Sequence, residues 1–71
     1  ETYLGCYAQW WNTAFAGYCY NTPQQVTVRL NADCSLETDY AGPWRTIHGT
    51  VAPFDNSECR HGVRSAWLGF K

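Results

Sequence analysis

Four cysteines in a chain of 71 residues constrain the fold more than any other feature of the sequence. A chain this short buries only about 60% of the surface that its unfolded form exposes, so its core alone gives marginal stability. Small domains usually compensate with disulfides, a metal or oligomerisation. An even number of cysteines without a metal-ligand spacing favours two disulfides and an oxidising compartment. The length fits one domain over residues 1–71, with the cysteines at Cys6, Cys19, Cys34 and Cys59.

Residue usage and the spacing of turn residues predict an all-β chain. Thr, Val, Tyr and Trp are common, and no long segment repeats apolar residues at helical spacing. Gly, Pro, Asn and Asp recur at roughly eight to twelve residues, which is typical of a sandwich or barrel. We therefore expect a small antiparallel β-sandwich or barrel of about five or six strands. The strands are expected over residues 4–10, 18–21, 26–30, 44–51 and 63–70.

Three stretches carry turn or loop signals. Thr22-Pro23 is expected to break the chain's pairing because proline cannot donate to a central ladder. Residues 31–33 look like a turn, and residues 53–60 are polar and rich in turn-forming residues. These stretches are therefore predicted to separate the strands.

Four cysteines allow three disulfide pairings, and the sequence alone leaves all three open. A first hairpin that pairs Cys6 with Cys19 would hold their Cα atoms about 4.5–5.5 Å apart, within disulfide range. This geometry favours the sequential pattern, in which Cys34 pairs with Cys59. Each bridge would contribute about 2–4 kcal/mol, enough to decide whether so small a core is folded.

The same hairpin sorts its aromatic residues onto two faces, because side chains alternate along a strand. Ala8 and Trp10 share a face with the two cysteines. The other face would gather aromatic rings around Gln9, and Trp and Tyr are typical interface anchors. Either face could form the core, and in both cases one ring of the Trp10-Trp11 pair stays exposed. The rings predicted around Gln9 are those of Tyr7, Trp11, Tyr18 and Tyr20.

Charge and composition exclude several classes of partner. The net charge is −1, and the five basic residues are dispersed, whereas nucleic acids and anionic membranes need a basic cluster. Residues 2–28 are uncharged but too rich in Gln, Asn, Thr and Gly to insert in a membrane as a helix. The absence of methionine fits a secreted chain whose signal peptide has been cleaved, and removal of a tag would explain it equally.

No catalytic or metal-binding motif is evident. The serines lack a Gly-x-Ser-x-Gly context, and a domain this small offers little room for a substrate cleft. Cys59-Arg60-His61 has no second pair of ligands nearby, and thiols in an oxidising compartment pair with one another. We therefore expect no enzymatic activity, no metal and no cofactor.

The layout resembles the small secreted proteins of Streptomyces and related actinobacteria, tendamistat-type α-amylase inhibitors among them. The alternating strand of residues 26–30 looks like that family's run after its second cysteine, and the Cys6–Cys19 hairpin corresponds to its first hairpin. The resemblance implies a sandwich with two sequential disulfides, whose first hairpin enters the amylase active site. The family's Trp-Arg-Tyr triplet has no counterpart here, where Trp10-Trp11-Asn12 is the nearest sequence, and Cys59 precedes a full strand instead of nearly closing the chain.

These observations together predict a secreted protein-binding module, most concretely an inhibitor of a secreted hydrolase such as an α-amylase. A disulfide-clamped hairpin loses little entropy on docking. The alternatives are a structural or adaptor subunit of a secreted toxin complex, or a carbohydrate-binding module that uses exposed Trp and Tyr. The candidate binding residues are Trp10, Trp11, Asn12 and Phe15 as anchors, together with Tyr7, Tyr18 and Tyr20.

Overall fold

Five antiparallel strands make up the fold in the computed structural model, which describes residues 4–71. All pairings are antiparallel, so the structure confirms the predicted all-β class and a strand number within the expected range. No helix among residues 4–71 is long and apolar enough to cross a membrane. The strands are β1 (Cys6–Trp10), β2 (Ala14–Cys34), β3 (Tyr40–Ala41), β4 (Arg45–Glu58) and β5 (Val63–Phe70).

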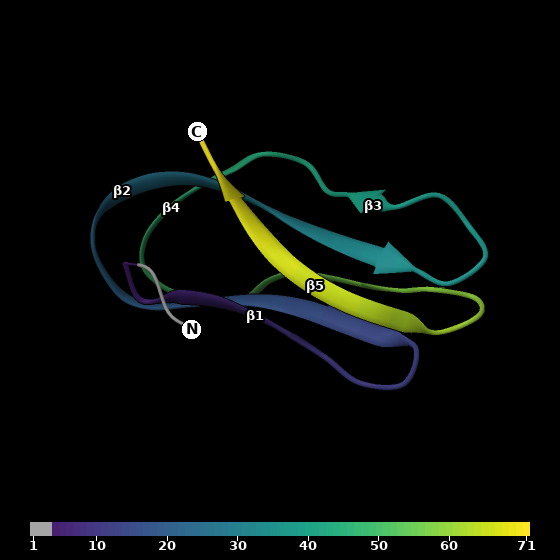
Figure 1. Cartoon of the computed structure of the whole chain (residues 1–71). Coiled ribbons are helices and arrows are strands. Elements are labelled where there is room, and N and C mark those ends of the chain that lie inside the picture. The colour runs from purple at the N-terminus through teal and green to yellow at the C-terminus, as the bar shows by residue number, and fades with distance from the viewer. Residues whose placement is uncertain (1–3) are drawn as a thin grey trace.

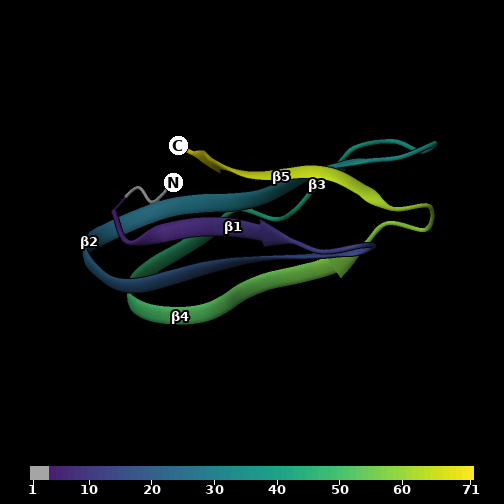
Figure 2. The ribbon, with the colours of Figure 1, turned by 60° about the horizontal axis from the view of Figure 1, so that its bottom comes forward.

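β2 is the centre of the fold because every other strand pairs with it. Its first part pairs with β1 and the end of β4, and its second part with β3, β5 and the start of β4. Between the two parts β2 bends, so that the sheet folds over into two layers (Figure 1, Figure 2). Asn21 has a φ of 50° at this bend, and the pairing with β4 shifts register on both sides of Thr22. The bend thus makes an antiparallel β-sandwich from one continuous strand.

The first hairpin has the register that the sequence predicts. Cys6 pairs with Cys19, and their disulfide joins directly opposed residues whose Cα atoms lie 4.0 Å apart. The second disulfide joins Cys34, the last residue of β2, to Cys59, which follows β4, with a Cα separation of 5.4 Å. Both favoured pairings are confirmed, and two disulfides indicate an oxidising environment.

The second strand begins at Ala14 instead of residue 18, and three stretches predicted as turns or loops lie wholly or partly within strands. Thr22-Pro23 does not end a strand. The paired residues of β2 and β4 pass from Thr22 directly to Val26, so Pro23 lies in an unpaired stretch where its lack of a backbone N–H donor costs no ladder hydrogen bond. Residues 31–33 are not a turn but part of β2, where they pair with β5. Residues 55–58 pair with residues 14–17 and so extend β4 through a stretch expected to be irregular. Polar side chains do not prevent strand formation, since the ladder satisfies the backbone whatever the side chains are.

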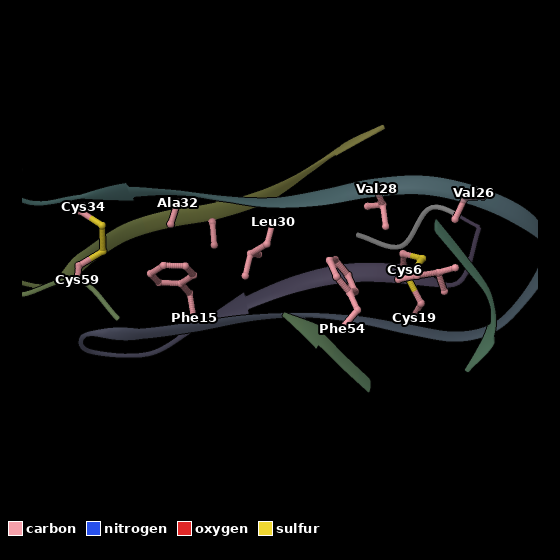
Figure 3. Close-up of a cluster of buried hydrophobic side chains, with 12 residues drawn as sticks. Cys6, Phe15, Cys19, Val26, Val28, Leu30, Ala32, Cys34, Phe54 and Cys59 are labelled. Carbon is pink, nitrogen blue, oxygen red and sulfur yellow. A yellow bond between two sulfur atoms is a disulfide. The ribbon is translucent and has the colours of Figure 1, made fainter. Parts of the chain in front are cut away.

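The core lies between the two layers of the folded sheet (Figure 3). Val28, Leu30 and Ala32 are buried on the second part of β2, and Phe15 and Cys19 are buried on the first part. The alternating residues Tyr18, Tyr20 and Arg29 are half-buried or exposed on the outside, as strand alternation requires, whereas Ala16 and Asn31 are buried as well. The disulfide-bearing face of the hairpin is therefore the core face. Of the two arrangements left open by the sequence, the structure selects the one with the tyrosines outside.

Candidate functional site

Three tyrosines form a ring cluster on the outer side of the first hairpin. Tyr7 comes from β1 and pairs with Tyr18 of β2, and Tyr20 is the next outward residue along β2. Their ring centroids lie between 5.2 and 6.3 Å apart, with planes inclined by 14° to 29°. Tyr20 is exposed, and the other two are half-buried. These three residues, here called the tyrosine face, form one stacked aromatic surface at positions that the hairpin register predicts.

The tyrosine face is uncharged. Burial, followed by the neighbouring Tyr20, raises the pKa of Tyr7 above its ordinary value of 10.0. Tyr7 therefore remains neutral at any physiological pH. No residue from position 4 to position 28 carries an Asp, Glu, Lys or Arg side chain, so the whole hairpin lacks formal charge. A partner would meet aromatic and amide groups on this hairpin, with no charge to desolvate.

Two tryptophans lie exposed at the tip of the same hairpin. Trp10 is 44% exposed and Trp11 49%. β1 ends at Trp10, and the chain then turns, with the Trp11 N–H donating to the Ala14 carbonyl at 2.9 Å. Trp11 has therefore left the strand, and within the described residues it makes no ring contact with the tyrosines. The single patch expected around Gln9 is instead a tyrosine face and a separate tryptophan tip.

Phe15, expected to be an exposed anchor, lies in the core. It is only 1% exposed, and its ring centroid lies 5.0 Å from that of Tyr40. The residue pairs with Trp10 and shares the inward face of β2 with Cys19, which explains its burial. Phe15 can support the tip from inside but cannot contact a docked partner. Asn12 is exposed in the turn, where it was expected.

Backbone hydrogen bonds hold the hairpin tip against the loop that precedes β5, at the end of the molecule opposite the bend of β2 (Figure 1). The Cys59 N–H donates to the Thr13 carbonyl at 2.8 Å, and the Val63 N–H donates to the Asn12 carbonyl at 2.9 Å. The disulfide to Cys34 fastens the same region to the end of β2. The tip is thus braced from several directions, which favours a rigid presentation of its tryptophans.

Leu36 is a candidate binding residue that the sequence analysis overlooked. Its side chain is 89% exposed, and its φ of 60° lies in a region that costs energy for a residue with a Cβ. The loop around it is held on both sides. The Ser35 N–H donates to the Gly62 carbonyl, and the Glu37 carboxylate accepts from the Arg60 N–H at 2.6 Å. The sequence feature that could have pointed to Leu36 is that it is the one apolar residue among the polar residues 35–39.

The described residues bring together no constellation for metal or acid–base chemistry. Within residues 4–71, no group of three or more His, Cys, Asp or Glu is placed to hold a metal ion, and every cysteine is in a disulfide. The Tyr40 hydroxyl donates to the Asp55 carboxylate at 2.9 Å, and burial with this bond raises the pKa of Tyr40 above 10.0. That hydrogen bond joins β3 to β4 and has a structural role.

One open depression, of about 250 Å³, lies at the other end of the molecule. Its lining contains neutral residues and a single charged one, Lys71. The lining has no carboxylate side chain and no imidazole. The depression therefore carries no catalytic argument, and the exposed aromatic surface remains the better candidate site.

Comparison of the chain with protein-family models, with curated proteins and with solved structures finds no significant match. The candidate site therefore rests on its own geometry: a charge-free, disulfide-clamped hairpin with a tyrosine face, a tryptophan tip and the neighbouring Leu36 loop.

Proposed function

We propose that the chain is a secreted protein-binding module that docks through its first hairpin, with the tyrosine face and the tryptophan tip as the contact surface. The observation that carries this proposal is the stacked cluster of three tyrosine rings on an uncharged hairpin whose tip exposes two tryptophans. Trp and Tyr provide large contact areas with few rotatable bonds, and they are enriched among the residues that dominate binding energy.

Rigidity supports the same proposal. The Cys6–Cys19 disulfide closes the hairpin at one end, and backbone hydrogen bonds with the Cys34–Cys59 region brace the other end. A surface that is already ordered loses little conformational entropy on binding, so more of its contact energy becomes affinity. Compact inhibitors reach high affinity in this way.

The most concrete form of the proposed function is inhibition of a secreted hydrolase. A braced hairpin tip that exposes two tryptophans is suited to docking in the active-site cleft of an enzyme, and the resemblance to tendamistat-type inhibitors makes α-amylase the first enzyme to test. The two disulfides fit the extracellular setting in which such an enzyme works. The proposal places Trp10, Trp11 and Leu36 at the centre of the contact, with the tyrosine face beside them.

The test begins with capture of partners from the culture fluid of the source organism and their identification by mass spectrometry. The identified partner, together with α-amylase, is then titrated with the wild-type chain and with Trp11→Ala and Tyr20→Ala. We expect each substitution to weaken binding by roughly tenfold or more, because truncating an interface anchor costs about 2–4 kcal/mol and each 1.4 kcal/mol is about tenfold. Trp67→Ala is the matched control, since Trp67 is similarly exposed, at 45%, but lies on the opposite outer face.

Wild-type affinity in both hairpin variants would exclude the hairpin as the docking surface. Stable binding of a partner with no effect on any hydrolase activity, but with the same loss in the hairpin variants, would identify an adaptor subunit instead of an inhibitor. These two outcomes separate the general proposal from its concrete form.

A further inference from the structure

The opposite outer face of the sandwich carries a second aromatic surface that the hairpin does not use. Arg29 and Asn31 alternate with the buried Val28 and Leu30, so their side chains point away from the core. Trp67 pairs with Asn31 across β2 and β5 and is 45% exposed. Its outward position on β5 places the indole on this second face.

Two cations gather on another indole of the same face. The Arg29 guanidinium carbon lies 4.6 Å from the ring centroid of Trp44, and the Lys71 ammonium lies 5.1 Å from it. Gly69 pairs with Arg29, and a Cβ at Gly69 would lie 3.8 Å from the Trp44 ring. The same Cβ would lie 3.2 Å from the Asn31 side-chain nitrogen, so the glycine leaves room for the side chains packed around it. The residues Arg29, Trp44, Trp67 and Lys71 are here called the tryptophan face.

The cations of the tryptophan face have no anionic partner among the described residues. The ion pair found within residues 4–71 joins Arg64 to Asp33, which lies on the same outer face two residues beyond Asn31 and is paired with that other cation. The Arg29 Nε is buried and has no hydrogen-bond acceptor in that part of the chain. In a chain of net charge −1, two positive groups thus converge on one exposed aromatic surface without neutralisation. An anionic ligand would complement them.

The shape of the surface selects among anionic ligands. Peptides are usually bound along a sheet edge or in a groove, where the protein supplies backbone hydrogen bonds or pockets. The tryptophan face is instead the outer surface of paired strands, whose backbone groups already bond to one another within the sheet. Sugar rings present flat C–H faces that pack on indole rings, and a carboxylate on such a ring suits a guanidinium, whose planar fork binds carboxylates.

We infer that the tryptophan face binds an acidic polysaccharide whose sugar units carry carboxylates, that is, a uronate polymer. Trp67 stacks on a sugar ring, while Arg29 and Lys71 neutralise the carboxylate of a neighbouring unit beside Trp44. Diagonal neighbours on adjacent strands lie about 7–8 Å apart, which long side chains span. Such a site would hold the module on an acidic extracellular matrix while its first hairpin stays free for a protein partner.

The test is affinity electrophoresis of the intact chain in gels that contain polygalacturonate, with the fully methyl-esterified polymer as the matched ligand control. We expect retardation by polygalacturonate that is at least tenfold weaker with the methyl ester and that declines steeply with added salt, because the carboxylate contacts are electrostatic. Trp67→Ala should weaken the binding at least tenfold. Arg29→Gln should abolish the preference for the acid form.

Trp11→Ala is the variant control and should bind polygalacturonate as the wild type does. This control keeps the inference separate from the proposed protein-binding function, since either surface can fail alone. Absence of retardation, equal retardation by both polymers, or loss of binding in Trp11→Ala would overturn the inference. Stronger binding of oligothymidylate than of polygalacturonate through the same residues would also overturn it, because stacked bases would then be the ligand.

Discussion

Gly17 lies where the two layers of the sandwich leave no space for a side chain. A Cβ at this position would lie 2.5 Å from the Phe54 ring, and Phe54 is buried. We expect Gly17→Ala to lower the free energy of unfolding by about 1–3 kcal/mol, the usual cost of overpacking a core. Urea unfolding followed by fluorescence measures this change.

A double-mutant cycle provides the control for that prediction. In a Phe54→Leu background the smaller side chain relieves the close contact, so Gly17→Ala should cost less there than in the wild type. Equal costs in the two backgrounds would mean that the contact with Phe54 is not the cause.

The raised pKa of Tyr7 predicts a loss of stability in alkali. Because the pKa is higher in the fold than the unfolded value of about 10, the folded state retains a proton that the unfolded chain releases above that pH. Stability is therefore unaffected below about pH 10 and falls as the pH rises through the folded pKa. Tyr7→Phe should reduce this slope, measured by urea unfolding between about pH 8 and 11. A slope equal to that of the wild type would contradict the assignment.

At the residue scale, strand alternation predicted the positions of side chains better than composition did. The pairing of Cys6 with Cys19 fixed which residues share a face, and so the grouping of Tyr7 with Tyr18 followed from the sequence. Alternation places Phe15 on the same face as Cys19, but the sequence left open which face of the hairpin is the core, and Phe15 was therefore misplaced as an exposed anchor. Leu36 was overlooked because its exposure depends on hydrogen bonds that hold its loop to residues far away in the sequence.

At the scale of elements, the predicted strands coincide with the structure where alternation is clear and differ where one strand changes layer. β5 has the expected bounds, and the hairpin register is as predicted. β2 was expected as separate strands because Thr22-Pro23 is a local stop signal. The strand bends there instead and continues, and pairing with β4 on both sides of the bend holds it. Pairing of this kind is a tertiary property that the local sequence does not encode.

The two disulfides should contribute to different parts of the molecule. Replacing Cys34 and Cys59 together with Ala should lower the free energy of unfolding by about 2–4 kcal/mol. It should also speed hydrogen exchange at the Val63 amide, which bonds to the Asn12 carbonyl beside that bridge. Replacing Cys6 and Cys19 should cost a similar free energy, with less effect on that amide under native conditions. Equal acceleration in both double variants would show that the tip is not braced by the second bridge.

At the scale of the whole molecule, the sandwich separates two aromatic surfaces. The uncharged tyrosine face and the tryptophan tip belong to the first hairpin, whereas the cation-bearing tryptophan face lies on the outer side of β2 and β5. The chain has twelve aromatic side chains, more than so small a core can bury. Their division between two faces follows from the bend of β2, which turns its two parts into opposite layers (Figure 2).

The four indole N–H signals of the chain provide the most direct test of docking through the hairpin. A ¹⁵N-labelled sample is titrated with the captured protein partner, and each signal is assigned by single substitution of its tryptophan. If docking uses the hairpin, the indole signals of Trp10 and Trp11 shift or broaden while those of Trp44 and Trp67 stay in place. Perturbation of Trp44 and Trp67 with no change at Trp10 and Trp11 would contradict docking through the hairpin.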